Sequence, residues 1–397
     1  MTDPCSTFSL YLHIPFCKHR CAYCDFNTYA GQENSIPAYV TALINEIEAV
    51  STLKPNPINV HTVFFGGGTP SLLSAPQIAS IMDALRAAFS FFADAEVTVE
   101  ANPGTVSPEK LSAMRDAGVN RISFGVQSAN TEELHMLERA HNFFDVIEAV
   151  SSARKAGINN LNLDLIYGLP EQTPATWQTT LKRIVDLNPA HISAYALTLE
   201  HGTPFGRWSA KGLLPLPNPD LAAEMYEYAM DFLANHGYIH YEISNWARPG
   251  HECHHNLQYW RGLPYLAFGA GAHGYANGYR YSNVLRIKTY IDRLTNSHSA
   301  PYHFPLSPAT INHHKQTRED EMSEYMLTNL RLVLAGVTET DFRSRFGSGL
   351  SETFPKELEE SIDAGLLEKE TSENSEVYRL TKRGRLLGNQ VFMWFVG

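Results

Sequence analysis

The sequence has few cysteines, no excess of basic charge and no long apolar run. Its 397 residues include 31 Lys and Arg against 42 Asp and Glu, a formal net charge of −11. Phosphate backbones require a concentrated basic face, so no nucleic-acid partner is expected. No apolar run approaches the roughly 18 residues that span a bilayer, and residues 1–7 lack the pattern of a secretory signal. We therefore expect a cytoplasmic protein.

The cysteines that are present are unevenly spread. There are five, and three of them fall within eight consecutive positions, while Cys5 and Cys253 stand apart. A secreted disulfide framework would distribute an even set along the chain. Three thiols so close together in a reducing compartment indicate metal ligands instead.

Apolar, strand-forming runs alternate with stretches of helical period through the first half of the chain. The runs that predict strands are residues 9–14, 61–65, 96–99, 121–126, 161–166 and 191–197. The stretches that predict helices are residues 39–50, 75–92, 108–117, 131–137, 144–156 and 173–186. This alternation indicates an α/β fold of βαβ units, whose right-handed crossovers curl a parallel sheet toward an incomplete barrel. An open doubly wound sheet is the alternative.

After residue 200 the pattern changes, and we expect three parts. Residues 1–200 form the barrel. Residues 201–317 form a linker and a His- and aromatic-rich segment that packs on the barrel, and residues 318–397 form a small domain. In the last part we expect helices and then strands at 319–334, 339–346, 366–370 and 377–380. Helices followed by a hairpin predict a winged-helix-like α+β domain.

The loops that follow the predicted strands are polar and rich in Gly and Pro. They begin Pro15-Phe16-Cys17, Gly66-Gly67-Gly68-Thr69-Pro70, Glu100-Ala101-Asn102-Pro103-Gly104, Gln127-Ser128 and Tyr167-Gly168-Leu169-Pro170. The carboxyl ends of parallel strands are where α/β barrels build their active sites. This convergence therefore indicates one functional site at that end of the sheet.

Cys17, Cys21 and Cys24 form a C-x3-C-x2-C motif after the first predicted strand. Thiolates are the ligands that iron–sulfur clusters require, and three of them bind three irons of a cubane. The fourth iron then stays open to a small chelating molecule. The alternative is a zinc site that adds His13 or His19, but zinc usually takes a second ligand pair from far along the chain, and none is evident.

Together these motifs resemble the oxygen-independent coproporphyrinogen III oxidase superfamily. The matching stretches are Tyr11-Leu-His-Ile-Pro-Phe-Cys17, the cysteine motif, and residues 66–70, 100–103, 124–127 and 164–170. The resemblance covers the chain from about residue 9 onward. It implies a partial (β/α)6 radical-SAM barrel with a [4Fe–4S] cluster on three cysteines and S-adenosylmethionine (SAM) on its open iron. The SAM-contacting positions that it implies are Tyr11, Tyr23, Gly67, Gly68, Thr69, Glu100, Gln127, Arg139, Asp164 and, with a weaker correspondence, Ala196.

Within that superfamily the sequence is similar to the HemW-type branch of heme chaperones. The true oxidases have a longer N-terminal lead and a further cysteine two residues after the third cluster ligand, where this chain has Phe26. An H-N-x-x-Y-W motif also matches the chaperone branch. An imidazole can ligate heme iron, and aromatic rings can contact the macrocycle. The resemblance thus implies heme contacts at His255, Asn256, Tyr259 and Trp260, with His254 and Cys253 as rival ligands.

The implied function is to bind heme and deliver it to acceptor hemoproteins, among them those of the respiratory chain, with a homodimer and peripheral membrane contact as further expectations. Two alternatives stay open. One is oxidative decarboxylation of coproporphyrinogen III, begun by hydrogen abstraction by a deoxyadenosyl radical, and the missing cysteine at Phe26 counts against it. The other is a non-catalytic regulatory or scaffold protein on the same fold. The residues leave open whether SAM is cleaved.

Overall fold

The computed structural model describes residues 7–296, 302–371 and 375–396. The chain packs into two compact units, each assembled from segments far apart in the sequence. The first unit comprises Met1–Phe232 and Pro264–Lys315, and the second comprises Leu233–Leu263 and Gln316–Gly397. The region 201–317, which the sequence suggested as one part, is therefore divided between the two units.

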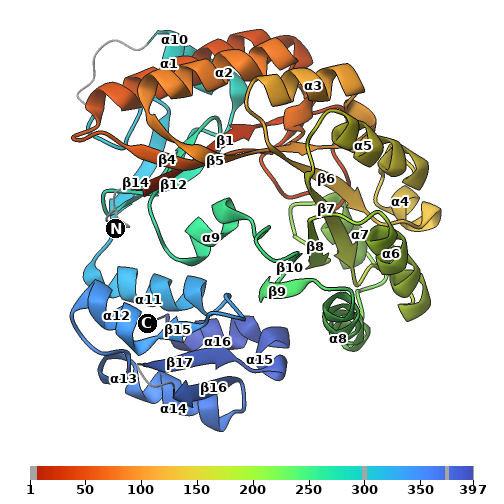
Figure 1. Cartoon of the computed structure of the whole chain (residues 1–397), viewed down its shortest axis with the longest axis vertical. Helices are drawn as coiled ribbons and strands as arrows, with labels where there is room; N and C mark the ends of the chain where they lie inside the picture. Colours follow the sequence, from red (N-terminus) through yellow and green to blue (C-terminus); the bar gives the residue numbers. More distant parts are fainter. Residues whose placement is uncertain (1–6, 297–301, 372–374, 397) are drawn as a thin grey trace. The chain divides into compact units, whose positions relative to one another are not determined.

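The first unit is built on a parallel sheet whose strands follow one another in chain order. The strands are β1 (Thr7–Ile14), β4 (Asn59–Gly67), β5 (Ser90–Ala101), β6 (Arg121–Gln127), β7 (Asn160–Tyr167) and β8 (His191–Ala196). Helices between them lie on one side of the curving row of strands (Figure 1), namely α1 (Ile36–Leu53), α2 (Ala75–Ala88), α3 (Pro108–Asp116), α4 (Thr131–Met136), α5 (Phe143–Lys155) and α6 (Pro174–Asp186). The expected partial barrel is confirmed.

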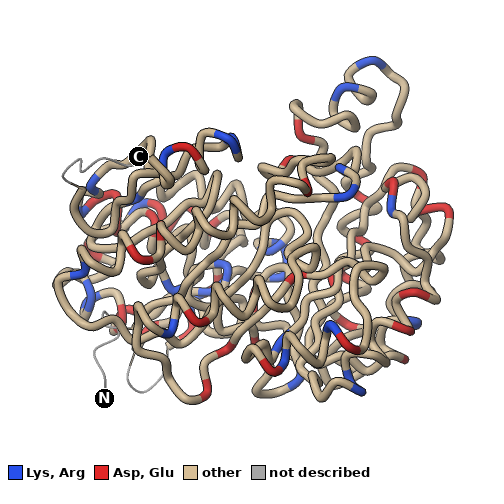
Figure 2. The backbone as a smooth tube through the Cα atoms, turned by 90° about the horizontal axis from the view of Figure 1, so that it is seen from above, with Lys and Arg blue, Asp and Glu red and all other residues tan. Residues whose placement is uncertain are grey.

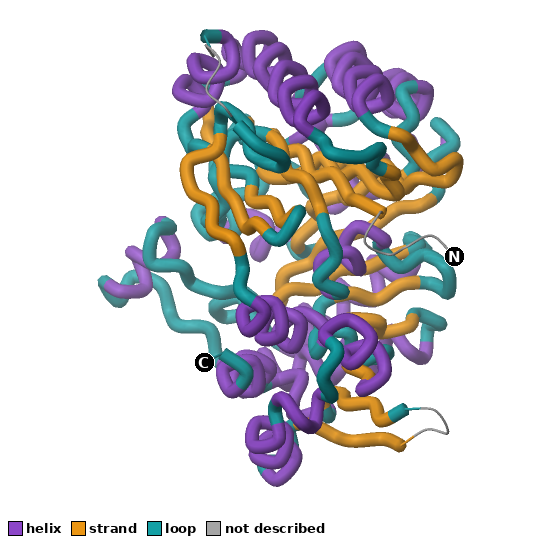
Figure 3. The backbone as a smooth tube through the Cα atoms, turned by 90° about the vertical axis from the view of Figure 1, so that its left-hand side faces the viewer, coloured by secondary structure: helices purple, strands orange, loops and turns teal. Residues whose placement is uncertain are grey.

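Further strands extend this sheet beyond β1. They are β11 (Tyr265–Phe268), which runs parallel to β1, and then β12 (His273–Ala276), β13 (Tyr279–Asn283) and β14 (Thr310–Lys315), which pair antiparallel. Figure 3 shows the layer of strands in orange and the helices in purple. The sequence did not predict these strands, because they are short and most of them carry His, Tyr or Gly in place of an aliphatic run.

A buried carboxylate holds this extension against α1. Glu46 accepts hydrogen bonds from the backbone nitrogen of Gly269 (2.8 Å) and from side chains of Asn283 (2.7 Å), Tyr290 (2.6 Å) and Ser307 (2.7 Å). Tyr290 lies on α10 (Ile287–Thr295). Burial raises the pKa of Glu46, and these four donors oppose that rise. The extension is therefore a fixed part of the first unit.

One boundary differs from the expectation. The sequence predicted a helix over 75–92, but α2 ends at Ala88 and β5 begins at Ser90. Phe91 pairs in register with Val60 of β4. Pairing with a neighbouring strand thus outweighs the helical period of this short aromatic stretch.

Several short connecting elements complete the first unit. They are β2 (Phe16–Cys17), β3 (Tyr29–Ala30), the 3-10 turns Glu33–Ser35, Pro70–Leu72 and Pro103–Thr105, and α7 (Pro204–Ala210). Helix α8 (Pro219–Asn235) then carries the chain from the first unit into the second.

The second unit combines helices with short antiparallel strands. Its elements are β9 (Ile239–Glu242), β10 (Asn245–Ala247), α9 (His254–Trp260), α11 (Arg318–Asn329), β15 (Val337–Thr338), α12 (Glu339–Phe346), α13 (Leu350–Thr353), α14 (Pro355–Asp363), β16 (Leu367–Thr371), β17 (Glu376–Leu380), α15 (Lys382–Leu386) and α16 (Gly388–Trp394). The order β15-β17-β16 forms a three-stranded sheet. The core includes Met326, Leu330, Phe342, Leu358 and Val391. The predicted helices and hairpin are present, although α11 ends five residues before the expected limit of 334.

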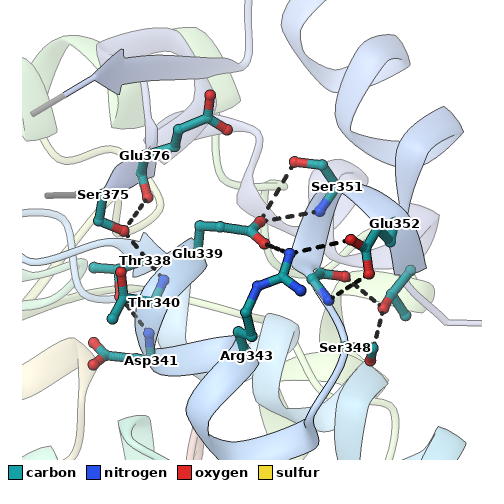
Figure 4. A network of polar contacts seen from close by, with 12 residues as sticks. Thr338, Glu339, Thr340, Asp341, Arg343, Ser348, Ser351, Glu352, Ser375 and Glu376 are labelled. Carbon is teal, nitrogen blue, oxygen red and sulfur yellow. Dashed lines mark hydrogen bonds and ion pairs between the residues drawn. The ribbon is translucent and has the colours of Figure 1, made fainter.

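Polar contacts fix the turn between α12 and α13 in this unit (Figure 4). The guanidinium of Arg343 donates to Glu339 (2.9 Å) and to Glu352 (3.2 Å), and Glu339 also accepts from the backbone nitrogen of Ser351 (3.2 Å). Arg343 is half exposed, so these ion pairs add little stability. They define local geometry, and we assign them no chemistry.

None of the described helices combines the length and the apolar composition needed to cross a bilayer. Figure 2 shows Lys and Arg interspersed with Asp and Glu along the described chain.

Candidate cluster and cofactor site

The carboxyl ends of the parallel strands surround a cavity of about 460 Å³ in the first unit. Twelve of the thirteen residues predicted for the cluster and SAM line it, namely Cys17, Cys21, Tyr23, Cys24, Gly67, Gly68, Thr69, Glu100, Gln127, Arg139, Asp164 and Ala196. Tyr11 is not among the lining residues. Its ring stacks on Phe64, and its hydroxyl lies 3.1 Å from Nδ1 of His13.

The cysteine loop is closed at its base and anchored in its middle. Cys17 ends β2, which pairs with β3, and the backbone nitrogen of Cys24 donates to the carbonyl of Cys21 (3.1 Å). Ala22 is fully buried in a small apolar cluster, and its carbonyl accepts from the nitrogen of Phe205 (3.0 Å). Packing at Ala22 therefore leaves the cysteines on either side of it facing the cavity.

The far end of the loop is held by Asn27. Its side-chain nitrogen donates to the carbonyls of Ala270 and Leu285, each at 3.0 Å, and its own carbonyl lies 2.9 Å from Nε2 of His13. Gly271 has φ +79°, and a Cβ atom there would collide with the Asn27 side chain. The Gly269-Ala-Gly-Ala stretch thus supports the cysteine loop from the sheet extension.

The thiols of Cys17 and Cys24 lie in an environment that disfavours uncompensated negative charge. Burial raises the pKa of Cys17 and of Cys24, and the neighbouring cysteines raise both further. Two donors point at sulfur: the Thr69 hydroxyl at Cys17 Sγ (3.7 Å) and the Arg139 guanidinium at Cys21 Sγ (3.6 Å). Thiolates here need a cationic partner, so the donor set fits a metal cluster.

The histidines of the zinc alternative are engaged elsewhere. His13 contacts Tyr11 and Asn27, and His19 contacts Glu138 at 3.0 Å. Within the described part of the chain, no three His, Cys, Asp or Glu side chains converge as ligands of one metal ion. A cluster gives each cysteine its own iron, so it does not require such convergence. Cys5 lies outside the described residues, and Cys253 is fully buried in the second unit.

The triple glycine allows β4 to end directly against the cysteine loop. Gly67 has φ +109°, and a Cβ atom on it would lie 2.5 Å from the His13 ring. A Cβ atom on Gly68 would lie 2.6 Å from the carbonyl oxygen of Phe16. The backbone nitrogen of Gly67 also donates to Glu100 (3.1 Å). Side chains at these positions would force the loop away from the strand end.

Two carboxyl groups face the cavity, Glu100 from β5 and Asp164 from β7, with β6 between these strands. Burial, with a smaller contribution from the Asp164 charge, raises the pKa of Glu100 to about 8. Burial also raises the pKa of Asp164, although Ser123 (2.8 Å) and Asn162 (2.7 Å) donate to it. With a pKa of about 8, the Glu100 carboxyl can either donate to or accept from a ligand's hydroxyl and amine groups. Gln127 joins them at a left-handed φ of +68°, a strained conformation typical of functional sites.

The cavity also contains residues that the sequence analysis did not select. Asn102, Ser123, Tyr195, Thr198 and Glu200 line it. Asn102 follows Glu100 by two positions in the same strand-end loop, a signal that could have found it. Tyr195 and Glu200 lie at and beyond the end of β8, where the sequence offers no distinctive pattern.

The H-N-x-x-Y-W motif forms most of α9, in the second unit. His255 is 1% exposed, and its Nε2 lies 2.8 Å from the hydroxyl of Tyr259. Trp260 lies 5.2 Å from the guanidinium carbon of Arg331. His254 is exposed, while Cys253 is buried and precedes the helix. The motif is therefore a packed helix whose preferred imidazole already has a partner.

Comparisons with known proteins agree with this geometry. Residues 11–184 match the model of the Radical SAM superfamily, and residues 316–387 match the HemN C-terminal domain. The heme chaperone HemW of Bacillus subtilis is 41% identical over 391 residues, covering 98% of this chain and 99% of that protein. HemW of Escherichia coli is 35% identical over 390 residues and covers 98% of both chains.

A solved structure shares the whole fold. Coproporphyrinogen III oxidase (HemN) from Escherichia coli, described as a radical SAM enzyme, superposes with a TM-score of 0.82 at 26% identity, covering 99% of this chain and 91% of that one. The sequence relatives match at higher identity over almost their full length. The chain belongs to the HemW family of the radical SAM superfamily.

Proposed function

We propose that Cys17, Cys21 and Cys24 hold a [4Fe–4S] cluster and that the adjoining cavity binds SAM. Membership of the radical SAM superfamily implies both cofactors. The three thiols on one cavity wall support this ligand set. When bound, the pair supplies one-electron reductive chemistry on a sulfonium.

The chain's own residues have separable roles in this proposal. The backbone at 67–68 gives a ligand close access to the strand end. Glu100 and Asp164 bind hydroxyl or ammonium groups, and Gln127, Tyr23 and Ala196 line the remaining wall. The Arg139 Nε is buried with no hydrogen-bond partner among the described residues, as expected for a group that awaits a ligand. Tyr11 supports the site indirectly through His13.

We propose that the cargo is heme, which the protein binds and passes to acceptor hemoproteins, including those of the respiratory chain. The single observation that carries this proposal is similarity to two proteins named heme chaperones over 98% of this chain. Phe26 supports it further. This side chain is 63% exposed on the cavity lining, at the position where the oxidases carry a further cysteine.

We place heme at α9, with His255 as the axial ligand and Asn256, Tyr259 and Trp260 as contacts to the macrocycle. Ligation through Nε2 would replace the 2.8 Å contact with Tyr259, at a cost of about 1 kcal/mol for one hydrogen bond. His254 is exposed on the same helix and is the competing ligand. A dimer and peripheral membrane contact remain part of the proposal.

An anaerobic comparison on the reconstituted full chain tests the function. Stoichiometric heme binding, transfer to an apo-hemoprotein and no turnover of coproporphyrinogen III are expected. Efficient formation of protoporphyrinogen would replace the chaperone proposal with the oxidase. His255→Ala should weaken heme binding and shift the Soret band, with His254→Ala as the matched control. If His254→Ala weakens heme binding and His255→Ala does not, His254 is the axial ligand.

A further inference from the structure

Asn102 joins the two hydrogen bonds that point at cluster-loop sulfurs. Its side-chain nitrogen donates to the Thr69 hydroxyl at 3.2 Å, and its side-chain oxygen accepts from Nη2 of Arg139. Thr69 in turn donates to Cys17, and Nη1 of Arg139 donates to Cys21. One continuous polar chain thus runs from Cys17 through Thr69, Asn102 and Arg139 to Cys21.

The direction of every hydrogen bond in this chain follows from Arg139. A guanidinium has donors only, so the Asn102 oxygen must face Arg139 and the Asn102 nitrogen must face Thr69. The Thr69 oxygen then accepts, which leaves its single proton for Cys17. The Asn102 amide therefore directs the Thr69 proton to Cys17, and it holds Arg139, which donates in any orientation, beside Cys21.

The surrounding backbone is arranged to keep Asn102 in this position. Its own carbonyl accepts from the nitrogen (2.9 Å) and the hydroxyl (2.7 Å) of Thr105, which fixes the backbone and leaves the side chain to bridge. Arg139 also donates to the carbonyl of Gly125 (2.8 Å). A Cβ atom on Gly125 would lie 3.3 Å from the Asn102 oxygen and 3.4 Å from Arg139. A glycine at 125 therefore leaves space for the bridge.

We propose that Asn102 is a positioning residue that sets the reduction potential of the cluster. Hydrogen bonds to cluster sulfurs stabilise the more negative, reduced state and thereby raise its potential. The inference rests on the proposed ligand set Cys17, Cys21 and Cys24. Asn102 acts through Thr69 and Arg139, and it needs no contact with iron.

The test is a redox titration of the reconstituted full chain without SAM. The electron paramagnetic resonance signal of the reduced cluster is recorded at each potential and gives the midpoint. Asn102→Leu and Thr69→Val should each shift the midpoint potential to more negative values. Their combination should shift it by less than the sum of the two, because part of the Asn102 effect passes through Thr69. Thr69→Ser should restore the wild-type potential. Asn120→Leu, which removes an amide that bridges Ala95 and Val97 outside the cavity lining, is the matched control and should leave the potential unchanged.

The outcomes separate this inference from the proposed function. If the reconstituted wild-type protein contains no iron and sulfide, the proposed cluster itself is overturned. A loaded Asn102→Leu protein with the wild-type potential, or fully additive shifts, would overturn only the role of Asn102. If Asn102→Leu does not load, Asn102→Ala is titrated in its place. Failure of both variants to load, at an unchanged unfolding temperature, would assign Asn102 to cluster assembly and contradict the proposal.

Discussion

The strand-end cavity of the first unit and helix α9 of the second differ in how ready they are for a ligand. In the cavity, glycines at 67 and 68 open the strand end, and buried polar groups face the open space. On α9, His255 is buried and in contact with Tyr259. The first site is preorganised, whereas the second must exchange an internal contact for its ligand.

This difference suggests different binding behaviour. Preorganised binding residues suit a resident cofactor, because the protein pays little conformational free energy when the cofactor binds. A helix that must release an imidazole suits a cargo that is bound and later given up, because the internal hydrogen bond reforms on release. The predictions below test the two halves of this comparison.

The largest effect is expected from the cysteines. Cys17→Ser should remove most bound iron and sulfide and the broad visible absorbance, because a three-thiolate site cannot lose a ligand without losing the cluster. Cys253→Ser is the matched control, since Cys253 is a buried thiol in the second unit. Equal iron loss in both variants would contradict the assignment.

The next effect concerns the preorganisation of the cavity. Gly67→Ala should lower stability by about 1–3 kcal/mol, because a side chain is strained at φ +109° and would collide with His13. The thermal unfolding midpoint and the iron content after reconstitution measure this. Gly104→Ala serves as the control, because a Cβ atom there would meet nothing within 4 Å. If Gly104→Ala lowers the unfolding midpoint as much as Gly67→Ala does, Gly67 has no special role.

The cavity was largely predictable from sequence for a definite physical reason. Parallel strands place their following loops on one edge, so residues as distant as Cys17, Glu100 and Asp164 could be expected to meet. The sheet extension could not be predicted, because β12 and β13 are short and lack an aliphatic pattern. Asn102 could not be assigned its role, because that role depends on Arg139, which is 37 positions away.

Helix α9 shows a different limit. A motif indicates which residue types suit heme, but it does not indicate which of two adjacent imidazoles a helix buries. Neighbouring helical residues point in directions about 100° apart, so His254 and His255 must differ in environment. Tertiary packing of the second unit decides that His255 is the buried one.

A smaller effect should appear in the pH dependence of stability. The pKa of Glu100 is raised to about 8, above its ordinary 4.5, chiefly by burial. The folded state therefore holds this proton more tightly than the unfolded state, so Glu100 makes stability fall as pH rises from about 4.5 to 8. Glu100→Gln should flatten the unfolding-midpoint profile over that range, although Asp164 keeps part of the slope. Glu109→Gln is the control, because hydrogen bonding lowers the pKa of this exposed carboxyl and keeps its titration below the range. An unchanged slope in Glu100→Gln would contradict the assignment.

The smallest effect tests whether α9 must release its imidazole. Tyr259→Phe keeps the ring but removes the hydroxyl that contacts His255, so heme should bind more tightly by about fivefold, which corresponds to about 1 kcal/mol. Heme titration at the Soret band measures it. Tyr378→Phe removes a hydroxyl bonded to Ser351 in the same unit and should leave heme affinity unchanged. Unchanged or weaker heme binding in Tyr259→Phe would mean that the His255 contact does not oppose ligation. The exposed His254 would then be the better ligand, and the contrast between a preorganised cavity and a closed helix would no longer hold.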